Sequence, residues 1–435
     1  MKLWEKNTNH IADDQERIVE EFTVGNDRDF DLVLAKYDIL GNLAHAEMLV
    51  KVGLLAQQEW KKMEGALLRM LQQAEQGEFV IEPGVEDVHS QVELNLTKEL
   101  GEVGKKIHSA RSRNDQVLVD LKLYLKDEVK NIAALTTKLF DRLQGLSEEH
   151  KEKLIPGYTH LQVAMPSSFG LWFGAYAESL VDDLEVLLAA YHVIDKNPLG
   201  SAAGYGSSFP IDREFTTRKL GFKTLNYNVV NAQMSRGKTE KILAMALATL
   251  AGTLNKLAYD VCLYMSQNFG FLHFPDTLTT GSSIMPHKKN PDVFELIRGK
   301  TTGIQAIPNE LILLTSNLPS GYHRDLQLTK ESLFPGINAL KECLWMTEYM
   351  LQYVEVKEGV LLDERYRYCY SVEAVNELVL KGVPFREAYQ QIGRAIEKGD
   401  FTPRFEIQHT HLGSIGNLAT AQIKTNFYQV LEQFE

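Results

Sequence analysis

With 435 residues, the chain is longer than one compact core usually holds, and its net charge of −12 argues against a sequence-independent nucleic-acid surface. A hydrophobic content of 44% and a charged content of 24% are ordinary for a soluble globular enzyme. The cysteines (Cys262, Cys343 and Cys369) lie far apart without a CxxC pair, and the first residues carry no apolar run. The sequence therefore predicts a cytoplasmic protein with reduced thiols.

Two long proline-free segments carry apolar residues three or four positions apart, which predicts helices. One begins near Val117 and the other near Ile242, and helices of about 40–50 Å are typical of a bundle completed by other subunits. The stretch from Ile242 to Tyr264 is the most apolar of the chain, but Lys256 and Asp260 interrupt it, so no membrane span is expected. Since strand signals are scarce, the predicted fold is mainly α.

Turn-rich segments predict the domain boundaries. We expect an N-terminal helical domain over residues 1–108 and a central helical bundle over 109–352, which contains a catalytic loop at 281–295. A helix stop and a new helix start within Lys381–Glu387 indicate a small C-terminal helical domain over 353–435.

The first polar cluster, Ser109–Val117, lies at the entry to the first long helix. Free N–H groups and the helix dipole favour anions at such a position, and Arg111 and Arg113 can add charge-assisted hydrogen bonds to carboxylates. An N-cap with a surface ion pair explains the same local pattern equally well.

The second cluster is Pro156–Gln162, which we expect at a loop–helix junction. A lone histidine is more often structural than catalytic, but Thr159 and Gln162 place hydrogen-bonding groups beside His160. A neutral imidazole can exchange a proton near neutral pH when an acidic partner orients it.

The third cluster, Gly281–Asp292, is too polar to bury unpaired, and its glycine and prolines interrupt any regular element. It predicts a mobile loop that carries chemistry. Lys288 and Asn290 can stabilise negative charge on a carboxylate oxygen, and Ser282 follows a glycine that can present its hydroxyl. Lys289 is expected to be a solvated charge.

The fourth cluster lies within Ser320–Lys330, where Tyr322, Gln327 and Lys330 can supply a hydroxyl, an amide and a cation to a polar substrate. Arg236, at another helix start, is a weaker candidate. Phosphate loops, the nucleophile elbow and zinc-spaced Cys/His pairs are absent from the sequence, so we expect no cofactor and no metal.

Taken together, these clusters closely resemble the argininosuccinate lyase family of the fumarase/aspartase superfamily. The resemblance runs in order from about residue 20 to 390 and is carried by Arg111–Val117, Pro156–Gln162, Ser282–Asp292, Asp325–Lys330 and Pro384–Ala388. It implies a mostly helical, three-domain subunit whose central helices build a 20-helix core in a homotetramer, with active sites formed between subunits. It also implies elimination of fumarate from argininosuccinate to give arginine, as in arginine biosynthesis.

The resemblance assigns Ser282 as the general base that removes the proton next to a carboxylate, although the neighbouring Ser283 is an alternative. Lys288 and Asn290 would stabilise the resulting aci-carboxylate, and because a free hydroxyl is a weak base, the loop would have to favour the alkoxide.

The leaving nitrogen would be protonated with help from His160, which the resemblance places beside Thr159 and orients through Glu295. The substrate-binding residues that it implies are Arg111, Asn114, Tyr322, Gln327 and Lys330, with Arg236 as an addition.

Several positions depart from the family pattern. Trp4–Thr8 and Phe22–Gly25 differ from the usual N-terminal motifs, the latter at a substrate-contacting serine, and Val163, Met165 and His287 replace the usual residues. A second hypothesis is therefore another fumarate-releasing lyase, of the adenylosuccinate, aspartate or malate type. A third is a catalytically silent helical scaffold.

Overall fold

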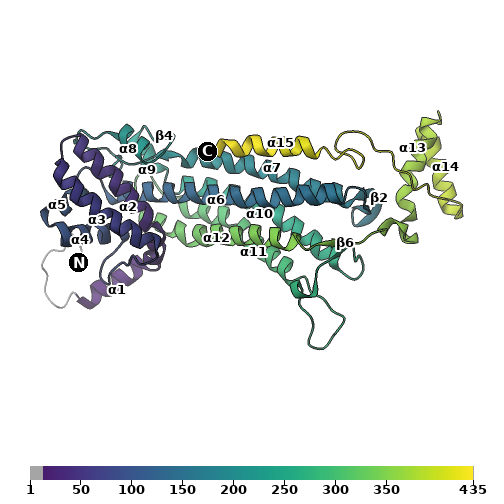
Figure 1. Ribbon diagram of the computed structural model, residues 1–435, viewed down its shortest axis with the longest axis horizontal. Helices are drawn as coiled ribbons and strands as arrows, with labels where there is room; N and C mark the ends of the chain where they lie inside the picture. Colours follow the sequence, from purple (N-terminus) through teal and green to yellow (C-terminus); the bar gives the residue numbers. More distant parts are fainter. Residues whose placement is uncertain (1–12, 435) are drawn as a thin grey trace. The chain divides into compact units, whose positions relative to one another are not determined.

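The computed structural model describes residues 13–434, so the departure at Trp4–Thr8 lies outside the described residues. The described chain is mainly α-helical, as predicted (Figure 1). Of its six helices longer than about 20 residues, one is α2 (Asp27–Lys51), and the five long helices of the central region are α6 (Arg113–Glu149), α7 (Phe169–Ile194), α10 (Lys238–Met265), α11 (Asp292–Thr315) and α12 (Thr329–Leu351). The two helical stripes predicted from the sequence lie in α6 and α10, and the 37 residues of α6 span about 55 Å.

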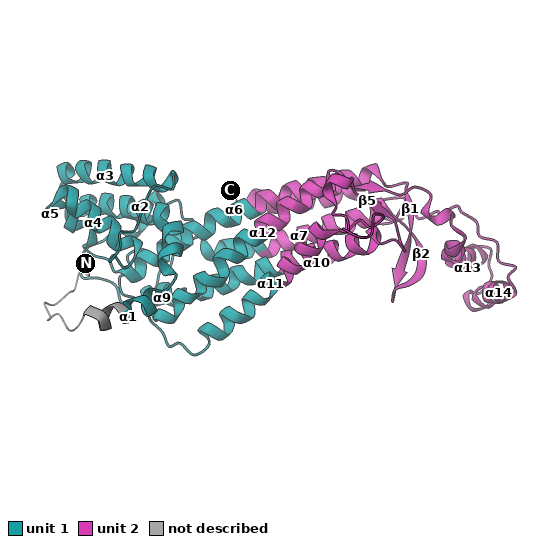
Figure 2. Ribbon diagram, turned by 90° about the horizontal axis from the view of Figure 1, so that it is seen from below, with its two compact units in different colours: residues 1–132, 187–248, 303–339 teal, residues 133–186, 249–302, 340–435 magenta. Residues whose placement is uncertain are grey.

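Two compact units divide the chain, and each boundary between them falls within one of the five long helices (Figure 2). Among the described residues, unit 1 comprises 13–132, 187–248 and 303–339, and unit 2 comprises 133–186, 249–302 and 340–434.

Besides its shares of the five central helices, unit 1 contains the long helix α2 and a set of shorter elements. These elements are α1 (Asp13–Val24), α2 (Asp27–Lys51), α3 (Gln57–Glu75), α4 (Val88–Leu100), α5 (Glu102–Lys105), the 3-10 helices η1 (Lys106–His108) and η3 (Arg324–Leu328), α8 (Arg213–Lys219), α9 (Val229–Met234), and the parallel strands β3 (Lys196–Asn197) and β4 (Thr224–Leu225). Helices α2, α3 and α4 pack around a core that includes Trp60, Met63, Leu67 and Val92. Trp60, Met63 and Leu67 recur every three or four residues in α3, which is the spacing that buries one helix face.

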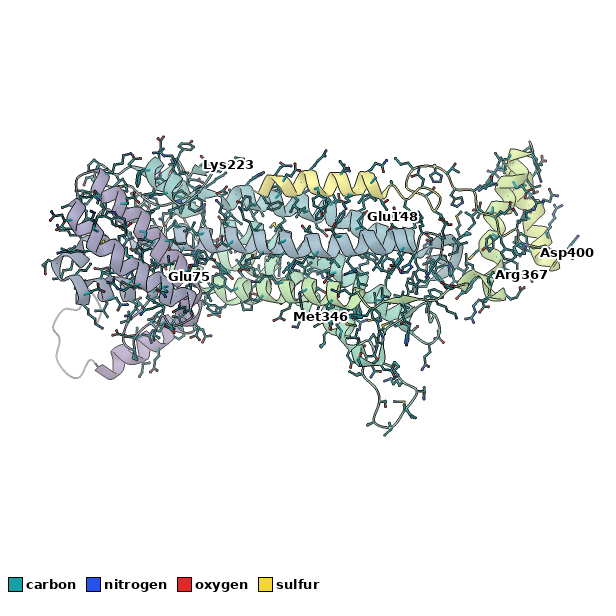
Figure 3. All side chains as sticks on the ribbon, in the orientation of Figure 1. Glu75, Glu148, Lys223, Met346, Arg367 and Asp400 are labelled. Carbon is teal, nitrogen blue, oxygen red and sulfur yellow. The ribbon has the colours of Figure 1, made fainter. Side chains whose placement is uncertain are left out.

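Unit 2 combines short strands with the C-terminal helices. These elements are β1 (Leu154–Thr159), β2 (Gln162–Ser168), β5 (Leu272–His273), β6 (Glu355–Val356), α13 (Ser371–Leu380), α14 (Phe385–Lys398), α15 (Thr420–Leu431), and the 3-10 helices η2 (Asp276–Leu278), η4 (Val360–Leu362), η5 (Glu364–Tyr370) and η6 (Glu432–Phe434). Helix α15 packs on α6, where the rings of Phe140 and Phe427 stack with centroids 3.8 Å apart. Nearby, Thr420 donates a hydrogen bond to Glu148, which Figure 3 labels.

The predicted loop–helix junction at Pro156–Gln162 is wrong, because β1 and β2 form an antiparallel hairpin there. Thr159 pairs with Gln162 across a two-residue turn, in which His160 and Leu161 have φ values of 55° and 58°. Two consecutive positive φ values define the turn that matches strand twist, but it is usually marked by Asn-Gly. The sequence lacks that signal at this position, so the hairpin escaped prediction.

Helix α10 is the one helix among the described residues that is long and apolar enough to cross a membrane, judged by length and composition alone. Half of its most apolar window is buried inside the structure. Its polar side chains also have protein partners: Asn255 donates to the carbonyl oxygen of Arg298 at 2.8 Å, and Asp260 accepts from Tyr176 at 2.6 Å. These contacts are typical of a core helix.

Gly170, at the start of α7, lets this helix lie directly on the end of α6. A Cβ at this position would come within 2.5 Å of the Ser147 carbonyl oxygen and of the Lys151 Cα. Because backbone atoms cannot move aside easily, Gly170→Ala is expected to lower the free energy of unfolding by about 2–4 kcal/mol. The control is Gly145→Ala, at an exposed position of α6. Its new methyl group meets nothing within 4 Å, and stability should rise by about 0.5–1 kcal/mol. Chemical denaturation of both variants measures the difference, and equal effects would contradict the close helix contact.

Asp183 on α7 is buried, and burial raises the pKa of its carboxyl group to about 6 despite a hydrogen bond with Thr253. Because the folded-state pKa lies above the unfolded one, the native state binds more protons between about pH 4 and pH 6, so stability falls as pH rises through that range. We therefore expect Asp183→Asn to stabilise the protein by about 1–3 kcal/mol at pH 8 and by much less at pH 4. Asp182→Asn, at the exposed neighbouring position, should change little at either pH. Denaturation at the two pH values tests this, and an equal gain at both would exclude the titration of Asp183 as its cause.

Candidate active site

Unit 1 contains a cavity of about 260 Å³ whose lining is dominated by polar and charged side chains. The lining comes from the α1–α2 turn and the start of α2, the residues that precede and begin α4, the start of α6, the turn before α10, and the segment from Tyr322 to Lys330. It consists of Val24, Asp27, Asp31, Glu86, Asp87, His89, Arg113, Asn114, Val117, Arg236, Tyr322, Arg324, Gln327 and Lys330. Segments separated by about 300 residues in sequence thus meet at one site.

Five of the predicted substrate-binding residues line this cavity, namely Asn114, Arg236, Tyr322, Gln327 and Lys330. Arg111 is not among the lining residues. Its guanidinium donates to the side-chain oxygen of Asn42, and burial lowers the pKa of this group despite the nearby Asp38 and Asp115. The neighbouring Arg113 lines the cavity instead. The same motif contains both arginines, and the sequence alone did not show which one faces the cavity.

A buried aspartate fixes the start of α6, which carries Arg113 and Asn114. Asp115 accepts hydrogen bonds from the backbone N–H of Ser112 at 2.8 Å and from those of Gly200 and Ala202 at 2.9 Å each. Burial raises its pKa to about 6, while these backbone donors oppose the shift. The carboxyl group therefore caps the helix and joins it to the 200–202 turn.

Arg113 is held by the residues that precede and begin α4. It donates to Glu86 Oε2 at 3.2 Å and to Ser90 Oγ at 2.5 Å, and its Nε lies 3.4 Å from Asp87 Oδ2. Asp87 also caps α4 by accepting from the Ser90 N–H at 2.7 Å. The guanidinium is therefore fixed in direction at the cavity wall.

Lys330 is almost fully buried, and its ammonium lies between two carboxylates. Nζ is 2.6 Å from Asp27 Oδ1 and 2.7 Å from Asp31 Oδ1. Burial raises the pKa of Asp27 to about 6, although the attraction of Lys330 opposes this shift. The sequence predicted the lysine but neither of its partners, because the segment around Asp27 and Asp31 matches no motif.

Gln327 and Arg324 bind the turn between α1 and α2. Gln327 Nε2 donates to the carbonyl oxygens of Thr23 and Val24 at 3.0 and 3.2 Å, and Arg324 Nε donates to Thr23 at 3.2 Å. This is the turn in which Gly25 departs from the family pattern, and the glycine has a φ of +51°. This departure from the family pattern therefore lies next to Val24, which lines the cavity.

Arg236 borders the cavity, but most of its hydrogen-bond donors are used within the protein. It donates to the Leu326 carbonyl at 2.8 Å and to Thr329 Oγ1 at 3.3 Å, and it pairs with Glu240. Only its Nε lacks a hydrogen-bond partner within residues 13–434. Arg236 therefore mainly fixes the segment that carries Gln327 and Lys330.

The remaining predicted residues lie in unit 2, on two exposed segments. Thr159 and His160 are at the turn of the β1–β2 hairpin. Ser282, Lys288 and Asn290 lie in the loop before α11, which stands clear of the helices of its unit in Figure 3. Lys289 in this loop forms an exposed ion pair with Asp276 at 2.7 Å, consistent with a solvated charge.

The loop has a defined base and an ordered serine. Asn290 and Thr280 exchange backbone hydrogen bonds of 2.8 and 3.5 Å, which close the loop at its base. The Ser282 hydroxyl oxygen accepts from the N–H groups of Met285 at 3.2 Å and Ile284 at 3.4 Å. Two donors directed at one hydroxyl favour negative charge on that oxygen.

The predicted pairing of His160 with Glu295 is not present within the described single chain. Glu295 lies in the first turn of α11, 3.9 Å from Arg298 Nη2, and has no hydrogen bond to His160 among residues 13–434. The exposed positions of both residues leave them available to other partners. Their joint role stays a prediction.

Comparisons with known proteins agree with this fold and these motifs. The lyase family profile matches residues 9–306, which assigns the chain to the lyases. The argininosuccinate lyase of Phocaeicola vulgatus is 56% identical over 433 residues, covering 100% of this chain and 96% of that protein. The argininosuccinate lyase of Thermotoga neapolitana is 43% identical over 391 residues, covering 90% and 97%. The chain therefore belongs to the argininosuccinate lyase family of the fumarase/aspartase superfamily, as the motifs predicted.

Among solved structures, EDDS lyase in complex with formate has a TM-score of 0.75 at 20% sequence identity, covering 95% of this chain and 90% of that one. This likeness supports the fold alone.

Proposed function

We propose that the protein is an argininosuccinate lyase that eliminates fumarate from argininosuccinate and leaves arginine. The observation that carries this proposal is the mixed charge of the unit 1 cavity. Its acidic residues are Asp27, Asp31, Glu86 and Asp87, and its basic residues are His89, Arg113, Arg236, Arg324 and Lys330. Argininosuccinate carries carboxylates together with an ammonium and a guanidinium group, so both kinds of lining residue have a counterpart on it.

The other substrates of the superfamily match fewer of the charged residues that line the cavity. Malate carries no cation, aspartate is small, and adenylosuccinate would bring a phosphate and a purine ring toward Asp27, Asp31 and Glu86. His287, which supported an alternative lyase, is exposed in the loop before α11. A silent scaffold gives no reason for a cavity lined by so many charged groups, because taking charges out of water costs free energy even when they are paired.

For the chemical step, we assign proton removal to Ser282. The Met285 and Ile284 N–H groups support an alkoxide on its oxygen, and Lys288 and Asn290 would stabilise the aci-carboxylate. His160, with Thr159 and Glu295, would then deliver a proton to the departing guanidino nitrogen. These assignments rest on the motif match and on the ordered loop.

We further propose a homotetramer with active sites composed of residues from several subunits. The long helices expose large apolar side chains that a soluble monomer would leave in water, including Met245, Tyr259, Leu296, Leu313 and Trp345. The five long helices of the central region, α6, α7, α10, α11 and α12, would also supply the twenty of the predicted core when four chains assemble. Such an assembly would bring the exposed loop and hairpin of one subunit to the cavity of another.

The three-domain division and the cytoplasmic location belong to the same proposal. The expected boundary at 108/109 falls just before α6 begins at Arg113, and the one at 352/353 falls just after α12 ends at Leu351. Limited proteolysis that cuts near these two boundaries would support the division.

The experiment that tests the function is fumarate release, followed by ultraviolet absorbance, with argininosuccinate, adenylosuccinate, aspartate and malate offered separately. We expect release from argininosuccinate alone. Release only from another substrate would keep the chemistry and replace the substrate, whereas no release from any of the four would support the scaffold.

A further inference from the structure

A buried histidine at the cavity wall has no role in the proposed chemistry. His89 lies in the first turn of α4, is 7% exposed, and lines the cavity. Its Nδ1 is 2.7 Å from Asp38 Oδ1 on α2 and 3.5 Å from Asp120 Oδ2 on α6. The imidazole therefore lies beside carboxylates from two other helices, α2 and α6, while part of the ring faces the cavity.

The surroundings of His89 favour its charged form. Burial alone would lower its pKa, but Asp38, Asp120 and Asp87 outweigh this effect and raise it to about 10. The charged groups that face this cluster are Asp31 and Asp38 from α2, Asp87 at the cap of α4, Asp120 and Arg113 from α6, and Arg111 just before α6. At neutral pH both ring nitrogens of His89 consequently carry a proton.

This charge state argues against a metal at the same place. The donor atoms of Asp38, His89 and Asp120 lie within 4.8 Å of one another, which is close enough to hold an ion. An imidazolium offers no lone pair to a metal, however, and it already neutralises the carboxylates together with the buried Arg111. The cluster is better described as a histidine fixed as a cation.

We propose that His89 binds a carboxylate of the succinyl half of the substrate through its Nε2–H, and that Asp38 and Asp120 are positioning residues that keep it charged and oriented. The proposal rests on the proposed function and names a binding residue that its motifs do not contain. The first turns of α4 and α6 both border the cavity, carrying His89 and Asn114, and helix N-termini favour anions. Since His89 keeps its proton, it binds the substrate and takes no part in proton transfer.

Product inhibition by the wild-type protein and by His89→Gln tests the binding role. We expect the inhibition constant for fumarate to rise at least about tenfold, because a charge-assisted hydrogen bond is lost. The inhibition constant for arginine should stay within about twofold. His192→Gln, an exposed histidine of the same unit, is the matched control and should change neither. Unchanged fumarate inhibition, or equal weakening for both products, would overturn the proposal.

The pH dependence tests the positioning residues. In the wild-type protein, the imidazole NMR signals of His89 should not titrate between pH 6 and about pH 9. In Asp38→Asn they should titrate at lower pH, and fumarate should bind more weakly as pH rises through the new pKa. Asp120→Asn is the second variant, and because burial raises the pKa of Asp120 well above its usual range, it should lower the His89 pKa less than Asp38→Asn does. A His89 signal that titrates near neutral pH in the wild-type protein would overturn the fixed charge.

Calorimetric binding of fumarate to wild-type protein and to His89→Gln separates this proposal from the proposed function. If argininosuccinate is not a substrate but fumarate binding still depends on His89, the proposed function is refuted and the carboxylate-binding role of His89 is supported. If argininosuccinate is turned over and fumarate binds equally to both proteins, the function stands and the role of His89 is refuted.

Discussion

Ser282→Ala is expected to lower kcat by about a thousandfold or more, while the fold and substrate binding remain intact. General bases contribute on the order of 10²–10⁴ to rate, and no other hydroxyl in the loop has the same environment. The Ser282 oxygen accepts two backbone hydrogen bonds, from Met285 and Ile284, which would stabilise the alkoxide that a serine base requires. Because the segment is largely exposed, loss of the hydroxyl should cost little stability. Single-turnover kinetics of fumarate release, together with a melting curve, measures both effects.

Ser283→Ala is the matched control for this experiment. Ser283 is the adjacent residue, is more exposed, and makes no side-chain hydrogen bond within the described part of the chain. Its variant should keep turnover within a few-fold of wild type if Ser282 is the base. The reverse result, an inactive Ser283→Ala beside an active Ser282→Ala, would move the role to Ser283. Normal turnover in both variants would remove serine catalysis altogether.

The long helices and the family were predictable from the sequence for a physical reason. Apolar residues every three or four positions can be buried on one side only if the segment is helical, and α6 and α10 follow that pattern over their whole length. The Ser282 loop was equally clear, because a segment with Gly281, Pro286 and Pro291 cannot form a regular element. Local chemistry determines such features, so the sequence is enough.

The β1–β2 hairpin and the cavity depend on contacts that no local pattern specifies. His160 and Leu161 occupy a turn usually reserved for asparagine and glycine, so the turn is imposed by the pairing of the flanking strands. Arg111 and Arg113 are two positions apart in one motif, and only the packing of α2 and α4 determines which of them faces the cavity.

The acidic residues of the cavity could not be predicted from the sequence, for the same reason. Asp27 and Asp31 lie about 300 residues from Lys330 in sequence, and a carboxylate on a surface-like helix gives no sign that it will be buried against a distant ammonium. His89 was missed because a lone histidine is usually structural. Its sequence neighbour Asp87 was a usable signal, but Asp38 and Asp120 were not.

Lys330→Met is expected to lower the free energy of unfolding by about 3–5 kcal/mol at pH 8 and to abolish measurable turnover. Lys330 is 2% exposed, and its removal leaves Asp27 and Asp31 facing each other in a poorly hydrated site. Loss of one partner from a buried ion pair costs more than the pair itself contributes, because the remaining charge is uncompensated. Urea denaturation and fumarate release measure the two effects.

An exposed lysine provides the control for stability. Lys289 lies 2.7 Å from Asp276, the same distance as the Lys330–Asp31 pair, but both partners are largely exposed. Lys289→Met should therefore change stability by less than about 1 kcal/mol. If the two lysine variants lost equal stability, the contribution of each ion pair would depend on the N–O distance and not on burial.

The stability loss in Lys330→Met should also depend on pH. Burial raises the pKa of Asp27 to about 6 while Lys330 opposes the shift, so without Lys330 the pKa rises further. A folded-state pKa above the unfolded one means that protonation favours the native state, so the loss should shrink as pH falls from 8 through the raised pKa of Asp27 toward about 6. Combining Lys330→Met with Asp27→Asn and Asp31→Asn should restore most of the stability at pH 8. If this triple variant folds but releases no fumarate, while the double variant Asp27→Asn with Asp31→Asn still does, Lys330 contacts the substrate besides holding the two carboxylates. Recovery of turnover would instead restrict the lysine to a structural role.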